Sequence, residues 1–157
     1  PTKDIIFFYK TKRNVNNKLW NRYGVKIGTK TDSKWVYMNN IFVKNINETD
    51  ILANPVESAK FKFNGKDRIV YLDGKYFNNY IPMKYYKNEV DTGVNVYTFG
   101  VKPVDYEPSG TINLSYVNDF NLMMKMNVSE EGNVHVYTRN YNILRIMGGQ
   151  SGLLYLK

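Results

Sequence analysis

Short apolar segments with period-two alternation recur along the chain, and this pattern constrains the fold more than any other feature. Phe120, Leu122, Met124 and Met126 occupy every second position of one segment, so their side chains share one face of a predicted strand. Core filling is favoured over a soft binding surface for the two methionines. No stretch of about 12 residues has the spacing of an amphipathic helix. The chain is therefore expected to be all-β, as a sandwich or a barrel.

Turn sequences separate these segments. Ala59–Phe63 alternates strictly and precedes Asn64-Gly65, a pair that supplies the positive φ angles of a tight turn. A second turn is expected at Asp73-Gly74. The predicted strands are Asp4–Tyr9, Lys34–Met38, Ile41–Val43, Ala59–Phe63, Ile69–Leu72, Val94–Phe99, Ile112–Tyr116, Phe120–Met126 and Val134–Ile146, followed by a final strand after Gly152.

The remaining segments lack sustained alternation. Asn39-Asn40 tolerates turn conformations, so the strands that flank it are expected to form a hairpin. Thr49–Ala59 is irregular and is interrupted by Asn54-Pro55, which favours a short helix or a loop crossing. Thr11–Lys34 and Lys84–Gly93 are expected to be surface loops.

Composition limits the chemistry that the chain can perform. At 157 residues it has the size of one domain with a single core, and its aromatic content of 15% favours strands. It contains no cysteine, which excludes disulfide bonds, thiolate zinc sites and cysteine nucleophiles. The only histidine, His135, lies in an alternating run, where a strand surface position is favoured over a catalytic role. Neither a metal site nor a cofactor is expected.

The chain carries a formal net charge of +8, which suits nucleic acid or another acidic surface. Its lysines are spread over the whole length and mixed with acids, so a solvated basic surface is favoured over a dedicated groove. No specific nucleic-acid binding is expected. No apolar run approaches the roughly 18 residues that span a bilayer, so no membrane insertion is expected. The chain opens at Pro1 with neither an initiator Met nor a signal peptide, which suggests a fragment or a processed piece of something longer.

Motifs of the common catalytic sites are missing from the sequence. It has no Walker loop, no Gly-x-Gly-x-x-Gly, no Gly-x-Ser-x-Gly and no His-Glu-x-x-His. A carboxylate pair for glycoside hydrolysis would have to face across a cleft. Most candidates are expected in turns, where Asp has an ordinary local role: Asp67, Asp73, Glu89, Asp91, Asp105 and Glu107. No catalytic residue is assigned, and the chain is not expected to be an enzyme.

Several segments form ordered landmarks along the chain. They are Asn64–Arg68, Gly74–Phe77, Tyr97–Pro103, Tyr106–Ser115 and Val136–Ile146. Together they resemble the major capsid proteins of nucleocytoplasmic large DNA viruses. The opening Pro1–Phe8 is similar to the first strand of that family's second jelly roll. Thr11–Ser58 matches only loosely, and Ile69 stands where the family has Phe after its Asp-Arg pair.

The resemblance implies an eight-stranded antiparallel jelly-roll β-sandwich over residues 1–157, as the C-terminal half of a double jelly roll subunit. In the family, three such subunits form a pseudo-hexagonal capsomer, and capsomers tile an icosahedral shell. The implied partners are further copies of the subunit, neighbouring capsomers and minor capsid proteins, in the virion and in the host cytoplasm during assembly. Two alternatives stay open: a stand-alone β-sandwich that binds carbohydrate or nucleic acid, and a poxvirus-like scaffold protein that assembles transiently.

Turn chemistry and side-chain type select the site residues. The structural turns are assigned to Gly65, Asp67, Pro108 and Gly110. The interface candidates are Trp20, Tyr23, Arg68 and Arg145. Large aromatics are enriched at interface hot spots, although covering the edge of the sandwich is an equally good role for Trp20. The two arginines are expected either to cap backbone carbonyls or to pair with a carboxylate at a subunit boundary.

Overall fold

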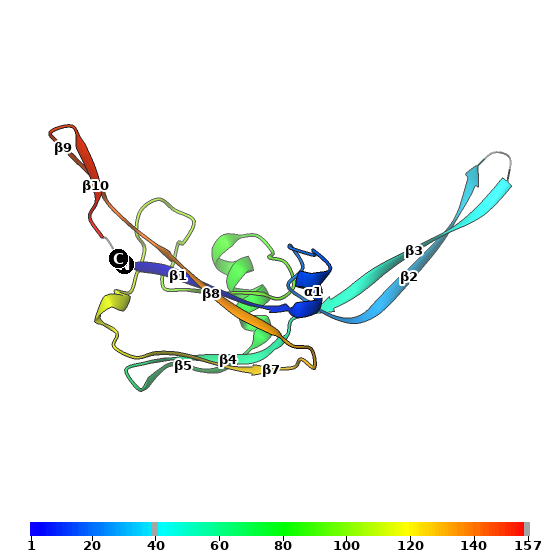
Figure 1. Cartoon of the computed structure of the whole chain (residues 1–157), viewed down its shortest axis with the longest axis horizontal. Coiled ribbons are helices and arrows are strands. Elements are labelled where there is room, and N and C mark those ends of the chain that lie inside the picture. Colours follow the sequence, from blue (N-terminus) through cyan, green and yellow to red (C-terminus); the bar gives the residue numbers. More distant parts are fainter. Residues whose placement is uncertain (39–40, 156–157) are drawn as a thin grey trace.

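The structure is a computed structural model that describes the backbone of residues 1–38 and 41–155 and the side chains of residues 1–27 and 52–155. Two three-stranded sheets form its body, and two hairpins extend from it (Figure 1). The elements in chain order are β1 (Thr2–Thr11), α1 (Lys12–Asn16), β2 (Val25–Met38), β3 (Ile41–Ala53), β4 (Val56–Phe63), β5 (Lys66–Asp73), η1 (Tyr76–Tyr80), η2 (Pro82–Tyr86), β6 (Val94–Thr98), η3 (Leu114–Tyr116), β7 (Phe120–Met126), β8 (Gly132–Asn140), β9 (Leu144–Met147) and β10 (Gln150–Leu153).

The two sheets of the body have the strand orders β6-β1-β8 and β5-β4-β7. Every strand pair in them is antiparallel, and Ile5 of β1 lies between Tyr97 of β6 and Thr138 of β8. In the other sheet, Phe61 of β4 lies opposite Leu122 of β7. The expected all-β antiparallel sandwich is confirmed. Over the described ranges the chain has ten strands rather than eight, because the two hairpins add four to the six of the body.

The core lies between the sheets and is centred on three phenylalanines. Phe7 of β1, Phe61 of β4 and Phe77 of η1 are fully buried. The ring of Phe7 meets those of Phe61 and Phe77 edge to face, at centroid distances of 5.9 and 5.6 Å, an arrangement that aromatic pairs prefer. Burial of one phenylalanine contributes about 1.5–3 kcal/mol to stability. The packing of this cluster is therefore a major contribution to the stability of the contact between both sheets and η1.

The predicted apolar face of β7 is confirmed. Its alternate side chains are partly buried and pack against the core, while the residues between them are exposed. The packed residues are Phe120, Leu122, Met124 and Met126. The two methionines therefore fill space at the margin of the core, as expected for flexible apolar side chains.

A helical segment made of the consecutive π-helical turns η1 and η2 covers one side of the core. Its residues Phe77, Ile81 and Pro82 are buried, and Lys87 ends it with a positive φ of 58°. The sequence predicted only a turn at Asp73-Gly74 and a loop from Lys84 to Gly93. β5 does end at Asp73, but Lys84 lies within η2, so the loop expectation is wrong for the first residues of that segment.

Other expectations for irregular segments were also wrong. Thr49–Ala59 belongs to β3 and β4, and only Asn54-Pro55 interrupts the strands. The Asn54 side chain stabilises that bend, because its Oδ1 accepts from the Val56 N–H at 3.2 Å and its Nδ2 donates to Asn95 Oδ1 at 2.8 Å. Ile112–Tyr116 is not a strand. Its last three residues form the 3₁₀ turn η3, which follows a capping hydrogen bond from the Ser115 N–H to Asn113 Oδ1.

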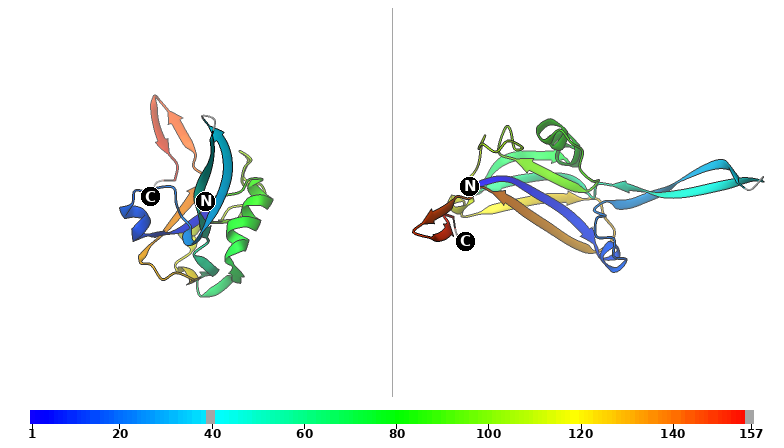
Figure 2. Two further views of the ribbon diagram at one scale, coloured as in Figure 1. Left: turned by 90° about the vertical axis from the view of Figure 1, so that its right-hand side faces the viewer. Right: turned by 90° about the horizontal axis from the view of Figure 1, so that it is seen from above.

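The hairpins extend from opposite ends of the body, as Figure 2 shows from above. β2 and β3 pair antiparallel from Val25↔Ala53 to Met38↔Ile41, which confirms the strand pairing expected around Asn39-Asn40; those two residues themselves lie outside the described residues. The expected loop Thr11–Lys34 therefore contains α1 and the first part of β2. β9 and β10 form the second hairpin.

Candidate assembly surface

The loop that joins α1 to β2 carries Trp20 and Tyr23, and hydrogen bonds fix its shape. Thr11 caps α1 by accepting from the Asn14 N–H at 3.2 Å, as short polar side chains do at helix starts. The Asn14 side chain donates across the loop to the carbonyl oxygen of Arg22 at 3.3 Å. The loop is therefore held at both ends before any partner binds.

Lys10 packs beneath the two aromatic residues. Its Nζ donates to the Trp20 carbonyl at 2.8 Å and lies 5.2 Å from the centre of the Trp20 ring and 5.7 Å from that of Tyr23. Tyr23 packs edge to face on Phe8 of β1 at 4.7 Å, whereas Trp20 is 61% exposed. The structure thus separates the two candidates: Tyr23 is packed against the sheet, and Trp20 presents its ring to the outside.

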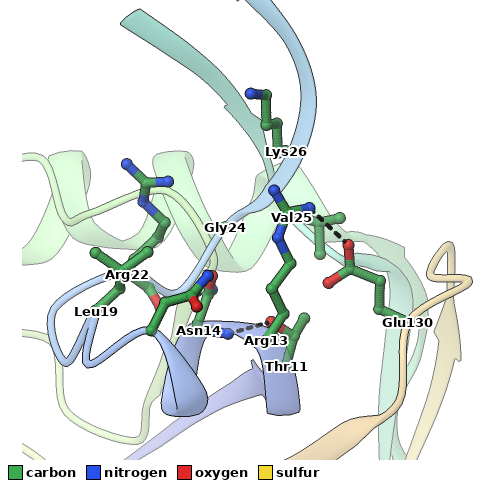
Figure 3. A pocket seen from close by; sticks show the side chains of 10 residues that line it. Thr11, Arg13, Asn14, Leu19, Arg22, Gly24, Val25, Lys26 and Glu130 are labelled. Carbon is green, nitrogen blue, oxygen red and sulfur yellow. Dashed lines mark hydrogen bonds and ion pairs between the residues drawn. The ribbon is translucent and has the colours of Figure 1, made fainter.

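A polar pocket lies beside this loop (Figure 3). Arg13, Arg22 and Lys26 line it together with Glu130 from the connection between β7 and β8. Arg13 pairs with Glu130 at 3.2 Å, and neighbouring Lys12 pairs with Glu131 at 2.6 Å. Because exposed ion pairs each contribute less than about 1 kcal/mol, capping and packing stabilise this region more than these charges do.

The other two interface candidates lie elsewhere. Arg68 is exposed on β5, at the edge of its sheet, and Arg145 is exposed on β9 in the hairpin at the opposite end of the body from α1 (Figure 1). Neither makes an ion pair with any residue of the described part of the chain. The structure does not bring Arg68 or Arg145 together with Trp20, so they do not form one site with it.

Of the four residues assigned to turns, three lie in connections between strands and one lies within a strand. Gly65 follows Asn64 in the turn between β4 and β5 with a φ of +77°. A Cβ atom on Gly110 would lie 2.6 Å from the Phe99 carbonyl oxygen, so close backbone approach requires glycine there. Pro108 is exposed in the segment between β6 and η3. Asp67 is a correction: it lies in β5, where its carboxylate pairs across the sheet with two lysines of β4, Lys60 and Lys62.

Sequence reasoning missed a buried polar cluster around Asp4. The Tyr86 hydroxyl donates to Asp4 Oδ2 at 2.6 Å, and Arg139 forms an ion pair with the same oxygen. Burial, and secondly the hydrogen bond to Asp4, raises the pKa of the Tyr86 phenol, and the hydrogen bond to Asp4 raises the pKa of the Arg139 guanidinium. An acidic residue beside the apolar run Ile5–Tyr9 was the available signal, since charged residues are seldom fully buried without a partner.

His135 lies on β8 with its ring stacked on Phe8 at 5.3 Å. In the described part of the chain, no group of three or more His, Asp or Glu side chains is placed to hold a metal ion. Among the same residues, no helix is long and apolar enough to cross a membrane.

Comparison with known proteins identifies the fold and the family. The sequence profile of a family described as large eukaryotic DNA virus major capsid protein matches residues 1–152. The chain is 39% identical over 107 residues to the major capsid protein of Chrysochromulina ericina virus, which covers 65% of this chain and 18% of that protein. It is 32% identical over 123 residues to the major capsid protein of Paramecium bursaria Chlorella virus 1, which covers 64% of this chain and 28% of that protein. The chain thus spans less than a third of the length of these curated relatives.

Solved structures give the same fold. A chain of the PBCV-1 virus capsid superimposes with a TM-score of 0.71 at 22% sequence identity, over 100% of this chain and 44% of that one. The Faustovirus major capsid protein superimposes with a TM-score of 0.64 at 14% identity, over 89% of this chain and 30% of that one. These likenesses define the fold as a jelly roll like that of the two capsid chains. The chain belongs to the family of large eukaryotic DNA virus major capsid proteins.

Proposed function

We propose that residues 1–157 form the C-terminal jelly roll of a capsid subunit built from two jelly rolls. Three such subunits assemble into a pseudo-hexagonal capsomer, and capsomers, joined by minor capsid proteins, tile an icosahedral shell around a large DNA genome. One observation carries this proposal: the whole chain superimposes on a capsid protein while covering 44% of it, the share expected for one of two similar domains. Assembly takes place in the host cytoplasm.

Lateral contacts of this domain are made through exposed side chains on rigid loops. Trp20 fits such a role, because its ring is exposed while Lys10 and the capped helix α1 hold its backbone. Interface hot spots are enriched in tryptophan, and little conformational entropy is lost when the loop is already ordered. Arg68 and Arg145 are exposed and reach separate surfaces, where each would pair with a carboxylate of a neighbouring subunit.

The full-length subunit that contains this domain tests the proposal. Its mass in solution, measured by light scattering, should be that of a trimer, and Trp20→Ser should shift it towards monomer. Tyr116→Ser is the matched control, because Tyr116 is an exposed aromatic residue of η3. Both variants should unfold at the wild-type urea concentration.

Three results would count against the proposal. A wild-type full-length subunit that stays monomeric would contradict the capsomer, and a subunit without a second jelly roll would contradict the two-domain architecture. A Trp20→Ser variant that trimerises like the wild type would remove Trp20 from the interface. The control must keep its trimer for the comparison to support the assignment. Tyr23→Ser is a poorer probe, because the Tyr23 ring packs on Phe8 and its loss would also destabilise the fold.

A further inference from the structure

An open cavity of about 580 Å³ lies beside the first residues of β1. Lys3 of β1, Tyr86 of η2 and Arg139 of β8 line it, together with part of the connection that follows β6. None of the interface candidates named above is among its lining residues. The cavity therefore joins side chains from distant parts of the sequence at a place that the proposed lateral contacts do not use.

Lys3 reaches this cavity from a β-bulge. Across the pairing of β1 with β8, Thr2 lies opposite Asn140, and the next paired residue of β1 is Asp4, opposite Arg139. Lys3 is therefore an extra residue of β1 without a partner on β8. Such a residue interrupts the regular alternation of a strand and directs its side chain to a new place. Lys3 is only 8% exposed, although it lies between two other buried residues.

The ammonium group of Lys3 lacks an anionic partner in the described part of the chain. Its Nζ lies 4.9 Å from the centre of the Tyr141 ring, which also lines the cavity, and it makes no ion pair or hydrogen bond with a described residue. Among the described side chains, the polar atoms sealed from solvent without a hydrogen bond are Asp4 Oδ1 and the Tyr141 hydroxyl. Lys3 Nζ is not one of them, so it opens onto the cavity. A lysine at this depth is seldom left without a partner.

Arg139 presents further donors to the same cavity. Its Nε and Nη2 donate to Asp4 Oδ2, and its Cζ lies 5.7 Å from the centre of the Tyr86 ring. These bonds use one edge of the guanidinium, and no described residue accepts from Nη1. The edge formed by Nη1 and Nη2 has the fork geometry that a carboxylate fits. Because the guanidinium is already held in place, binding to it costs little side-chain entropy.

The charge balance of the cavity favours a single carboxylate as its ligand. Asp4 already neutralises Arg139, and Asp105 in the cavity wall lies 3.9 Å from Lys102. Of the charged residues that line the cavity, Lys3 is the one without a counter-charge in the described ranges. A carboxylate would balance it with one negative charge. A phosphate dianion would bring an excess negative charge close to the two aspartates.

Exposed apolar side chains stand beside these donors. Val104 is 61% exposed and Tyr106 is fully exposed, and both line the cavity next to Pro103. A small free anion would leave these side chains in water. A peptide that carries its carboxylate next to an apolar residue would cover them, and covering apolar surface favours binding. The cavity thus fits an acidic residue within an apolar stretch of a polypeptide.

From these observations we infer that the cavity binds an Asp or Glu side chain of a partner polypeptide. Lys3 supplies the balancing charge, the free edge of Arg139 supplies hydrogen-bond donors, and Val104 and Tyr106 contact an apolar residue next to the acid. The inference does not depend on the capsomer, because peptide binding by the chain is measured without assembly.

Titration of the 157-residue chain with short blocked peptides, followed by NMR chemical shifts, tests this inference. The probe is acetyl-Gly-Leu-Glu-Val-Gly-amide, and acetyl-Gly-Leu-Gln-Val-Gly-amide is its uncharged counterpart. The Glu peptide should bind saturably and at least ~10-fold more tightly than the Gln peptide. Lys3→Met should abolish this preference. Lys125→Met is the matched control and should keep it, because Lys125 of β7 also lies over a tyrosine ring, that of Tyr71 at 5.1 Å, but does not line the cavity.

Urea unfolding of Lys3→Met adds a readout that distinguishes charge from packing. The variant should unfold at the same or a higher urea concentration than wild type, because it loses a buried charge without a counter-charge and keeps a side chain of similar length. If it loses its cooperative transition instead, Lys3→Gln takes its place in the titration.

Several results would overturn the inference. They are the absence of saturable binding, equal binding of the Glu and Gln peptides, an unchanged preference in the Lys3 variant, and a lost preference in Lys125→Met. Sodium acetate that binds as tightly as the Glu peptide would show an anion site without a peptide. Inorganic phosphate or a single-stranded oligonucleotide that binds more tightly at the same residues would contradict the choice of a carboxylate.

Discussion

Arg139 on β8 and Asp4 on β1 are cross-strand neighbours, and together they form the most deeply placed ion pair among the described residues. Asp4 is fully buried, whereas the Arg139 side chain is 50% exposed. The guanidinium donates through both Nε and Nη2 to Asp4 Oδ2, with Nε at 3.0 Å, and Oδ1 accepts no hydrogen bond from the described residues. All of these hydrogen bonds to the Asp4 carboxylate therefore go to Oδ2, and they come from Arg139 on β8 and Tyr86 on η2.

Replacing Arg139 with Met should destabilise the domain by about 2 kcal/mol. Removing one partner of a fully buried ion pair costs about 3–5 kcal/mol, and the value is lower here because Arg139 is half exposed and water screens it. Urea unfolding measures the change. Arg68→Met is the control, since an exposed arginine without an ion pair in the described ranges should change stability by less than about 0.5 kcal/mol. Equal effects of the two variants would show that the Asp4 pair contributes nothing.

The stability that Tyr86 contributes to the domain should be lost at high pH. Burial and the bond to Asp4 raise the pKa of Tyr86, so the folded state keeps this proton at pH values where the unfolded chain, with a tyrosine pKa of about 10, has released it. The contribution is fully present below about pH 10 and is lost as the pH rises towards the folded-state pKa.

The test compares wild type and Tyr86→Phe in unfolding experiments from pH 8 to pH 11. Tyr86→Phe should be less stable at pH 8, because it lacks the bond to Asp4, and its stability should fall less steeply above pH 10. The pKa of Tyr76 is also raised, mainly by burial, and this residue keeps its contribution in both proteins. Parallel curves for the two proteins would contradict the role of Tyr86.

Gly65→Val should destabilise the domain by about 1 kcal/mol, through backbone strain alone. The φ of Gly65 is positive, and no atom lies within 4 Å of a Cβ added there, so the cost is that of a side chain in the left-handed region. Gly110→Ala should cost more, because its Cβ would lie 2.6 Å from a carbonyl oxygen. Thermal unfolding of both variants gives the order, and the reverse order would contradict the contact at Gly110.

Oligonucleotide binding by the isolated chain should be weak and blind to sequence. The net charge of +8 attracts phosphates, but the basic side chains are spread over separate elements. Fluorescence titration with two unrelated single strands measures this at low and physiological salt. Saturable submicromolar binding at physiological salt would instead support the stand-alone binding module.

The strands that were correctly predicted have one of two physical properties. β4 and β7 each have one face on the core and one face in water, so their sequences alternate. β1 was found because it is central and its run of strong β formers is buried. The turn at Asn64-Gly65 was readable since few other residue pairs tolerate two positive φ angles.

The parts that were missed lack such a signal. Within β2 and β3, the segments Lys34–Met38 and Ile41–Val43 were predicted and the rest was missed. These strands pair only with each other in the described residues, and a ribbon outside the sandwich is under no requirement to alternate. The helical segment Tyr76–Tyr86 is rich in aromatic residues and asparagine, and it is wide π-helix, whose periodicity differs from the 3.6-residue repeat that indicates a helix. The Asp4 cluster joins residues from three distant segments. The acid beside an apolar run indicates a buried charge, but neither local pattern nor spacing reveals its partners.

The pairing of β1 with β6 and β8 sets the order in which the ribosome can complete this domain. β1 ends at Thr11 and its first partner, β6, begins at Val94, so about 80 residues must be synthesised between them. At roughly 5–20 residues per second, the apolar strand β1 waits about 4–16 seconds for a partner. During that interval the nascent chain exposes Ile5 and Phe7, which the finished domain buries completely. Folding of this domain would then depend on chaperones that shield these two side chains until β6 has been synthesised.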